Sequence, residues 1–471
     1  MRCRKGPVGA YQITAAEIAA VTGGRYIFGF EASGVSIDTR SLQPGDLFIA
    51  IEAERDGHDF VEEAFEKGAV GAVVQRTPKG ALGPMVWVEN TLSALNDIAR
   101  YARDRSGARV IAVTGSVGKT STKEMLRCAL SEQASVHAAQ ASYNNHIGVP
   151  LTLARTPKGA DLIIVEIGMN HPGEIRPLSK LARPDVAIVT NVAAAHLAAF
   201  RSVDFIALEK AQIFAGMKPG GVAIYNADTV RSDILARAAT ESAATLVSFG
   251  VSENAAMKSL LVEPCETGST AFLYISGCVH TCRLQVSGSH AALNALAALS
   301  AIDCIGLDVA KASRALSRWS PPAGRGTREV IEIHPGQTIE LIDDAFNANP
   351  ASVASGLDTL RLVEPRNGGR RIAVLGDMLE LGDQAHRMHA EIAQVSSLNQ
   401  IDRIDCIGPL MASLWEVLPE SKRGICLPGP DNFPLAGRFQ DGDVVLVKGS
   451  KGSKTSAVAE RLRGLRTDAA A

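Results

Sequence analysis

Residues 109–125 constrain the fold of this chain more than any other stretch. The apolar run from Val110 to Val113 leads into Thr114-Gly-Ser-Val-Gly-Lys-Thr-Ser121, and a helical pattern follows. Such a loop points successive backbone N–H groups inward, and the helix N-terminus adds partial positive charge, so the loop suits the phosphates of a nucleotide. Val113 takes the place of the first glycine in the GxxxxGK[ST] pattern, which makes this a shortened phosphate loop.

Two side chains of this loop have expected roles. Lys119 would reach the outer phosphates, and Thr120 would hold Mg²⁺. The residues expected to surround the phosphates are Gly115, Ser116, Val117, Gly118, Lys119, Thr120 and Ser121.

The length of 471 residues predicts about three domains, because a domain usually has roughly 100 to 200 residues. The 48 Lys and Arg residues nearly balance the 50 Asp and Glu residues, so no overall field would recruit nucleic acid or a membrane surface. Any anionic ligand must therefore be bound by local groups.

The eight cysteines are scattered without CxxC spacing, which favours free thiols in a reducing compartment over a disulfide framework. Cys278, His280 and Cys282 would share one face of a strand and are a weak candidate for a structural metal, since no fourth ligand is evident.

The basic segment Met1 to Lys5 is not followed by an apolar run of signal length, and no stretch approaches ~18 uninterrupted apolar residues. We therefore expect a cytoplasmic protein without membrane insertion.

The first 107 residues mix short strand patterns with turns, and they predict a separate α/β domain over residues 1–107. The strand patterns cover residues 34–40, 46–51 and 69–74. Segments 38–40 and 56–60 lie at strand or turn edges, where their polar groups could meet a polar ligand. Taken alone, each segment is more typical of a turn or a helix cap.

Strands alternate with helices from Arg109 onward, which predicts a doubly wound, mostly parallel sheet over residues 108–325. Ligands gather at the carboxyl ends of the strands in such a sheet. Four polar residues fall at or just after strand ends: Glu166, Thr190, Asn191 and His196. Each one alone is more typical of a cap or a solvated side chain.

A proline and glycine cluster at residues 321–326 predicts a hinge into a third domain, residues 326–471. Its strand patterns, at 339–343, 371–375 and 444–447, alternate with helical patterns and predict a Rossmann-like fold without a GxGxxG fingerprint. The basic loop at 448–455 lacks an adjacent Gly-Lys pair. We therefore expect it to face a ligand without forming a second nucleotide site.

A phosphate loop alone could serve a kinase, a GTPase, a motor or a ligase, and the absence of an Asn-Lys-x-Asp motif disfavours a GTPase. Further segments resemble the Mur ligase family, and the resemblance covers nearly the whole chain. These segments are residues 114–120, 143–150, 166–170, 190–191 with 195–197, 209–213, 289–290 with 294–298, 343–349, 376–382 and 447–450.

The resemblance implies an ADP-forming amide ligase with three domains. The last three segments resemble most the family member that joins D-alanyl-D-alanine to UDP-N-acetylmuramoyl-tripeptide. ATP would phosphorylate the tripeptide carboxylate, and the dipeptide amine would displace phosphate, giving UDP-N-acetylmuramoyl-pentapeptide for cytoplasmic peptidoglycan precursor synthesis. Closure of the third domain about residues 324–327 would exclude water from the acyl phosphate. We expect a monomer that uses ATP and Mg²⁺ and binds these two substrates, with no nucleic acid.

The same resemblance assigns residues to the reaction. The expected catalytic residues are Lys119, Glu166, His196 and Lys210. Thr120 and Glu166 would hold a first Mg²⁺, while His196 and a carbamylated Lys210 would hold a second.

The resemblance also assigns residues to substrate binding. Asn294 would contact adenine, Arg325 would lie near the outer phosphate, and Asp344 and Asn347 would lie near the nucleoside. In the first domain the residues expected to hold the UDP sugar are Ser36, Asp38, Thr39, Arg40, His58 and Asp59.

Three departures from the family pattern stand out. Ala291 replaces an Asn of the usual Gly-x-His-Asn run, the segment 51–58 is one residue short, and His146 stands where Asp or Asn is commoner. The sequence leaves open whether the third peptide residue is diaminopimelate or lysine, and which residues read D-alanyl-D-alanine.

Three alternatives remain at this stage. The ligase that adds the third amino acid typically carries an Asp-Asn-Pro-Arg motif in its third domain, and none is present here. A folylpolyglutamate synthetase would lack the N-terminal UDP-type domain. A relative without catalysis, acting as a regulator or scaffold, is disfavoured because the four expected catalytic residues are retained.

Overall fold

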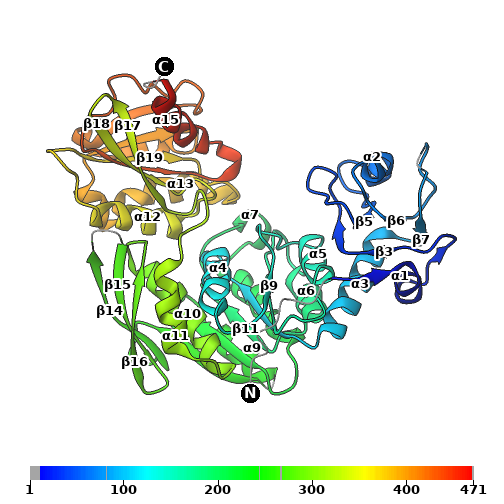
Figure 1. The fold of residues 1–471 in the computed structure, drawn as a ribbon. Coiled ribbons are helices and arrows are strands. Elements are labelled where there is room, and N and C mark those ends of the chain that lie inside the picture. The colour runs from blue at the N-terminus through cyan, green and yellow to red at the C-terminus, as the bar shows by residue number, and fades with distance from the viewer. Residues whose placement is uncertain (1–10, 81, 243, 266–267, 469–471) are drawn as a thin grey trace.

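The computed structural model describes residues 11–80, 82–242, 244–265 and 268–468, and it consists of three α/β bodies that follow one another along the chain (Figure 1). This confirms the predicted fold class. The blue N-terminal body and the orange C-terminal body lie on different sides of the green central body. The basic segment Met1 to Lys5 lies outside the described residues.

The N-terminal body contains a five-stranded sheet and a two-stranded ribbon. Its elements are β1 (Ile13–Thr14), α1 (Ala15–Thr22), β2 (Arg25–Tyr26), β3 (Glu31–Ala32), β4 (Gly34–Ser36), β5 (Asp46–Ile49), α2 (Val61–Glu66), β6 (Gly71–Val74) and β7 (Met85–Trp87). Strands β4 to β7 are parallel, and β2 pairs antiparallel with β7. Alternate side chains of β5 enter different cores: Leu47 and Ile49 pack in one cluster, and Phe48 packs in another.

Helix α3 (Thr91–Ser106) joins the first body to the second. Asn90 caps its start by accepting the Ser93 N–H at 2.8 Å, and Gly107, with φ +66°, ends it. The apolar face of α3 packs against two helices of the central body, α5 (Gly148–Ala154) and α6 (Ile175–Ala182). One continuous apolar cluster therefore runs from Leu47 of the first sheet to Val110 of the central sheet.

The central body contains a nine-stranded sheet in the order β16-β15-β14-β13-β12-β11-β8-β10-β9. Its strands are β8 (Arg109–Thr114), β9 (Val136–Ala138), β10 (Leu162–Glu166), β11 (Val186–Val189), β12 (Val222–Asn226), β13 (Thr245–Gly250), β14 (Met257–Cys265), β15 (Gly268–Ile275) and β16 (Cys278–Leu284). All pairings are parallel except the antiparallel pairs β14–β15 and β15–β16. The predicted parallel sheet is therefore extended by an antiparallel meander.

Helices cover both faces of this sheet. They are α4 (Lys119–Leu130), α5, α6, α7 (Leu197–Phe200), α8 (Val203–Ala211), α9 (Ser232–Glu241), α10 (Ser289–Cys304) and α11 (Val309–Ala315). Val110 and Ala112 of β8 face the cluster that contains α5, α6, α8 and α9. Ile111 and Val113 face the cluster that contains α4, α10 and α11. Because β8 is apolar on both faces, it lies inside the sheet and delivers the phosphate loop to its edge.

The C-terminal body contains a six-stranded sheet in the order β17-β18-β22-β19-β20-β21. Its elements are β17 (Thr327–His334), β18 (Gln337–Asp343), α12 (Pro350–Leu362), β19 (Arg371–Gly376), α13 (Ala385–Glu391), β20 (Arg403–Ile407), α14 (Ala412–Val417), β21 (Arg423–Leu427), β22 (Val444–Lys448) and α15 (Ser456–Asp468). Among the described strands of this body, β17 and β18 pair antiparallel and the other pairs are parallel. The predicted Rossmann-like alternation is present, preceded by this hairpin.

The connection into the C-terminal body is held to that body. The Gly326 N–H donates to Asp343 O at 2.8 Å, and the Phe346 N–H donates to Gly324 O at 2.9 Å. Gly324 and Gly326 have φ values of +71° and +85°. Within the described ranges, every helix is too short or too polar to cross a bilayer.

Candidate active site

A cavity of about 310 Å³ lies between the central and C-terminal bodies, where β8, β10 and β11 end and α4 begins. Ligands bind at this edge of parallel sheets. The predicted residues that line it are Ser116, Val117, Gly118, Lys119, Thr120, Ser121, Glu166, His196, Asn294, Arg325, Asp344 and Asn347. The structure therefore brings together predicted residues from the central body, the connection and the C-terminal body.

Two glycines give the phosphate loop its shape. Gly118 has φ +84° and is the N-cap of α4, and a Cβ at this position would lie 2.3 Å from Asn294 Oδ1. At Gly115, with φ +154°, a Cβ would lie 1.9 Å from Thr190 Oγ1. Backbone conformation and close neighbours together require glycine at both positions.

Lys119 is the first residue of α4, and its side chain folds back over the loop. Its Nζ donates to Gly115 O at 2.6 Å. Burial lowers the pKa of Lys119, Glu166 opposes this, and Arg325 lowers the pKa further. A phosphate in the loop would offer this ammonium a charged acceptor, which binds more strongly than a carbonyl oxygen.

Three side chains converge on Glu166, which is 3% exposed at the end of β10. Thr120 Oγ1 donates to Glu166 Oε2 at 2.9 Å. Ser142 Oγ and Asn144 Nδ2 each donate to Glu166 Oε1 at 2.8 Å. Neither Ser142 nor Asn144 was predicted from the sequence, although Asn144 lies within the family-like segment 143–150, which could have marked it.

Lys123 holds the loop that carries Ser142. Its side chain is fully buried in α4, and Nζ donates to Ala139 O at 2.7 Å and to Ala141 O at 3.2 Å. Glu124 pairs with the same ammonium at 2.8 Å. The buried charge is therefore fully partnered, and it fixes the backbone just before Ser142.

His196 lies in the loop after β11, and its backbone has φ +57°. Its Nδ1 lies 2.5 Å from Glu380 Oε2 of the C-terminal body. Burial lowers the pKa of His196, whereas Glu380 opposes this and the nearby Lys119 and Lys210 lower it further. A neutral imidazole of this kind keeps a ring lone pair for a metal ion.

Lys210 lies behind the cavity, in the last turn of α8, and is 2% exposed. Its Nζ lies 4.0 Å from Met169 Sδ. Burial, with Lys119 nearby, holds the pKa of Lys210 well below its usual range, and Glu209 opposes this. Glu209 itself accepts the N–H groups of Gly173 and Ile175 at 2.8 and 2.9 Å, so it caps α6.

The connection and the C-terminal body contribute the remaining predicted nucleotide contacts. The Arg325 guanidinium lies 3.9 Å from the centre of the Phe346 ring. Lys448 is 2% exposed, and its Nζ donates to Asp344 Oδ2 at 2.6 Å and to Asn347 O at 3.1 Å. The predicted ligand-facing loop therefore begins with a lysine that orders Asp344 and Asn347.

The predicted UDP-binding residues lie in the N-terminal body, outside this cavity. Ser36 and Thr39 are buried, and Ser36 Oγ donates to Asp38 O at 3.0 Å. Arg40 Nη2 donates to Asp38 Oδ2 at 2.6 Å, and this pairing lowers the pKa of Asp38 to about 2. The role of these four residues in substrate binding stays a prediction, as does that of the exposed Asp59.

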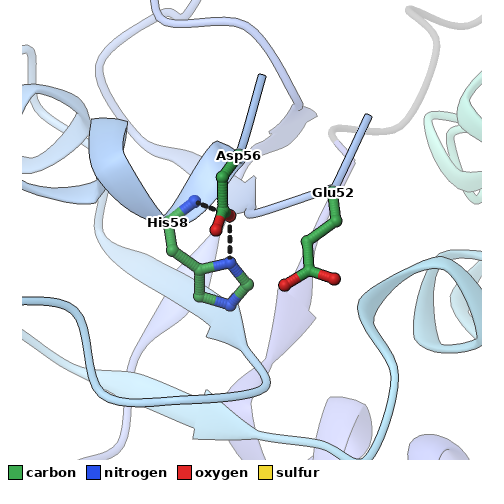
Figure 2. A group of neighbouring side chains, drawn as sticks. All are labelled: Glu52, Asp56 and His58. Atoms are coloured by element: carbon green, nitrogen blue, oxygen red, sulfur yellow. Dashed lines mark hydrogen bonds and ion pairs between the residues drawn. The ribbon is translucent and has the colours of Figure 1, made fainter. Parts of the chain in front are cut away.

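Glu52, Asp56 and His58 lie close enough together to suggest a metal site (Figure 2). His58 Nδ1 donates to Asp56 Oδ1 at 2.7 Å, and the Gln75 N–H donates to His58 Nε2 at 3.0 Å. Arg76 pairs with Glu52 at 2.6 Å and also with Asp56. Because protein groups already satisfy the imidazole and the carboxylates, we interpret this group as structural. A direct contact of His58 with UDP stays a prediction.

Replacing His58 with glutamine should make the N-terminal body less sensitive to acid. Burial lowers the pKa of His58 in the folded protein, whereas a histidine in the unfolded chain has a pKa of about 6.5. As the pH falls below that value, the unfolded chain binds more protons than the folded one, so the folded state loses stability. The urea midpoint for this body should therefore fall less between pH 7.5 and pH 5.5 in His58→Gln than in the wild type. The exposed His146→Gln is the control and should behave like the wild type. An equal fall in all three proteins would contradict this explanation.

The second metal candidate from the sequence lies on β16. Cys282 is buried, His280 is half-buried and Cys278 is exposed. Among the described residues, the group of three with the spacing of a metal site is the one in Figure 2. We interpret the β16 cysteines as free thiols, and burial raises the pKa of Cys282 to about 12.

Three family models match the chain in succession. They are the Mur ligase family catalytic domain at residues 31–103, the Mur ligase middle domain at 113–302, and the Mur ligase glutamate ligase domain at 329–451. The UDP-N-acetylmuramoyl-tripeptide–D-alanyl-D-alanine ligase of Bacillus subtilis is 34% identical over 91% of this chain and 93% of that protein.

Two solved structures are similar over nearly their full length. MurF from Acinetobacter baumannii has a TM-score of 0.85 and 27% identity, covering 97% of this chain and 100% of that one. MurF ligase from Thermotoga maritima in complex with ADP has a TM-score of 0.78 and 26% identity, covering 92% of this chain and 98% of that one.

Proposed function

The chain belongs to the Mur ligase family, and we propose that it uses ATP to join D-alanyl-D-alanine to UDP-N-acetylmuramoyl-tripeptide. The products are UDP-N-acetylmuramoyl-pentapeptide, ADP and phosphate. The observation that carries the proposal is the convergence of Lys119, Glu166 and His196 on one cavity between two bodies. The names of the relatives and of the similar structures supply the substrates.

The residues of the cavity fit a phosphoryl transfer followed by an acyl transfer. The phosphate loop and Lys119 would position the ATP phosphates and neutralise their charge, which is most of what phosphoryl transfer requires. A carboxylate oxygen of the tripeptide attacks the γ-phosphorus and ADP leaves. The dipeptide amine then attacks the acyl carbon, loses a proton and expels phosphate.

The donors at the loop fit Mg²⁺, which prefers oxygen ligands. Thr120 Oγ1, Ser142 Oγ and the Glu166 carboxylate lie within hydrogen-bond distance of one another. Asn191 lines the same cavity, and its buried Oδ1 finds no donor among the described residues. Thr120 and Glu166 would hold this ion, and when bound it would neutralise phosphate oxygens.

A second ion would be held by His196 and a carbamylated Lys210. A buried, neutral amine can add CO₂ to give a carbamate, which supplies a carboxylate-like ligand in place of a cation. The burial of Lys210 and its contact with a thioether support this proposal.

The remaining proposals concern organisation. We divide the chain at 1–107, 108–325 and 326–471, with closure of the third domain about residues 324–327. We also infer a monomer that works in the cytoplasm.

A Gly326→Pro variant should lower turnover while leaving ATP affinity nearly unchanged. Proline requires φ near −65° and lacks the N–H, whereas Gly326 has φ +85° and donates to Asp343 O. Stopped-flow turnover and nucleotide titration measure the two effects. Gly336→Pro, at another positive-φ glycine (φ +75°) that does not line the cavity, is the control. Unchanged turnover in Gly326→Pro would count against the hinge.

Phosphate release tests the function. The assay contains ATP, Mg²⁺ and UDP-N-acetylmuramoyl-tripeptide, with D-alanyl-D-alanine added or withheld, and we expect sustained release only with both substrates. Release with the UDP-muramoyl dipeptide and a diamino acid would move the assignment to the sister ligase. No release with any UDP-muramoyl substrate would support the non-catalytic relative.

A further inference from the structure

Two loops from different bodies meet at His196. One is residues 196–198 of the central body, and the other is residues 376–382 of the C-terminal body. His196 Nδ1 contacts Glu380 Oε2 at 2.5 Å, and the Ala198 N–H donates to Glu380 O at 3.2 Å. A Cβ at Gly382 would lie 3.3 Å from Ala198 Cα, so the two backbones are close. Both the side chain and the backbone of Glu380 therefore dock on the central body.

The loop that carries Glu380 is fixed within its own body. The Met378 N–H donates to His389 Nε2 at 2.9 Å, and the Leu379 N–H donates to Ser450 Oγ at 3.0 Å. Glu380 follows with φ +65°, a conformation that costs energy in a non-glycine residue unless the surroundings hold it. The Glu380 carboxylate is therefore fixed relative to the C-terminal body and should move together with it.

The contact selects one tautomer of His196. An ionised carboxylate only accepts hydrogen bonds, so Nδ1 must carry the proton and Nε2 keeps the lone pair. His196 lines the cavity, and Nε2 is the ring nitrogen that Glu380 leaves for a ligand there. In many metal-binding histidines, one ring nitrogen binds the metal and the other donates its N–H to a carboxylate. This hydrogen bond fixes the orientation of the ring and raises the basicity of the metal-binding nitrogen.

Stability does not explain the contact. The side chain of Glu380 is 59% exposed, and a polar contact this exposed contributes little to folding. Replacing Glu380 should therefore leave the protein folded, which makes its role testable.

We propose that Glu380 is a positioning residue, which docks with the C-terminal body on His196 Nδ1 and thereby presents His196 Nε2 to the cavity. The inference rests on the proposed function, because it assigns His196 to the second metal position. The active arrangement of His196 would then depend on the third domain being in place.

The test compares Glu380→Ala and Glu380→Gln with the matched control Asp383→Asn. Asp383 is an exposed carboxylate three residues along the same chain segment. The first readout is the ¹⁵N spectrum of labelled histidine in the ADP-bound enzyme, with the His196 signals assigned from a His196→Gln sample. The second is Mn²⁺ binding followed by electron paramagnetic resonance, and the third is kcat with the KM for ATP.

In the wild type, His196 should show a protonated Nδ1. Glu380→Ala should shift it towards a mixture of tautomers, weaken the second Mn²⁺ about 10-fold and lower kcat about 10- to 100-fold, without raising the KM for ATP. Glu380→Gln keeps an acceptor oxygen for the Nδ1 proton, but its amide can also donate to Nδ1, so it should hold the tautomer only in part and recover part of kcat. Asp383→Asn should match the wild type in every readout.

A Glu380→Ala enzyme with wild-type tautomer, Mn²⁺ binding and kcat would overturn the inference and leave the proposed function intact. If the wild type makes no pentapeptide but the tautomer still depends on Glu380, the proposed function fails and the contact stands. Thermal unfolding of each variant shows whether a loss reflects misfolding. If Glu380→Ala unfolds, Glu380→Gln decides: a fall of kcat to the level of His196→Gln would overturn the acceptor role.

Discussion

Replacing Lys119 with alanine should lower tripeptide-dependent phosphate release about 10³-fold, which is the scale expected when a charge-stabilising group is lost from a preorganised site. In the structure its ammonium is held by Gly115 O at 2.6 Å, over the loop that we propose binds the phosphates. Stopped-flow phosphate release and nucleotide titration separate the loss of rate from the loss of binding. Lys119→Arg should restore little, since a planar guanidinium does not fit a position shaped for a point charge.

Lys158→Ala is the control for Lys119→Ala, because it removes an exposed lysine of the central body away from the cavity. It should keep wild-type rates. Lys119→Ala with more than a tenth of the wild-type rate would contradict the assignment of this loop to phosphoryl transfer.

Replacing Lys210 with methionine should also lower turnover about 10³-fold, through loss of the carbamate ligand, while the protein becomes no less stable. Methionine fills the same buried volume and removes an amine that burial disfavours as a charge. Turnover at limiting and saturating Mg²⁺ and thermal unfolding measure the two effects. Full activity of Lys210→Met or Lys210→Ala at limiting Mg²⁺ would exclude Lys210 as a metal ligand.

Carbamylation of Lys210 has its own signature. Wild-type enzyme prepared without CO₂ should lose activity and regain it when bicarbonate is added, and ¹³C-bicarbonate should give a carbamate signal that Lys210→Met lacks. Lys218→Met, which removes a surface lysine paired with Asp185, should keep that signal. A signal of equal strength in Lys210→Met would place the modification elsewhere.

The fold could be predicted where the residue pattern of a single strand indicates whether its two faces are buried. Residues 110–113 are apolar at every position, and in the structure they face two different cores. The hairpin β14–β15 was not predicted. Its alternating pattern is weak, and Pro264 argues against a strand although it is tolerated near the end of this hairpin. The packing of α3 on two central helices depends on distant residues, which no local pattern reveals.

The candidate site could likewise be predicted where its residues are marked by their place along the chain. The phosphate loop is contiguous, and Glu166 and His196 stand at strand ends, so chain order alone marks them. Ser142 approaches Glu166 because Lys123 anchors the loop before it, and Glu380 reaches His196 because two bodies dock. These contacts arise from tertiary packing between separate segments. The sequence offered for them only the family-like segments 143–150 and 376–382.

The most direct test of the central claim follows an oxygen atom from the substrate to phosphate. UDP-N-acetylmuramoyl-tripeptide labelled with ¹⁸O in its terminal carboxylate is incubated with ATP, Mg²⁺ and D-alanyl-D-alanine, and the products are analysed by mass spectrometry. An acyl phosphate requires one ¹⁸O in the released phosphate and one in the new amide of the pentapeptide. Unlabelled phosphate, or labelled tripeptide that remains unjoined, would contradict it.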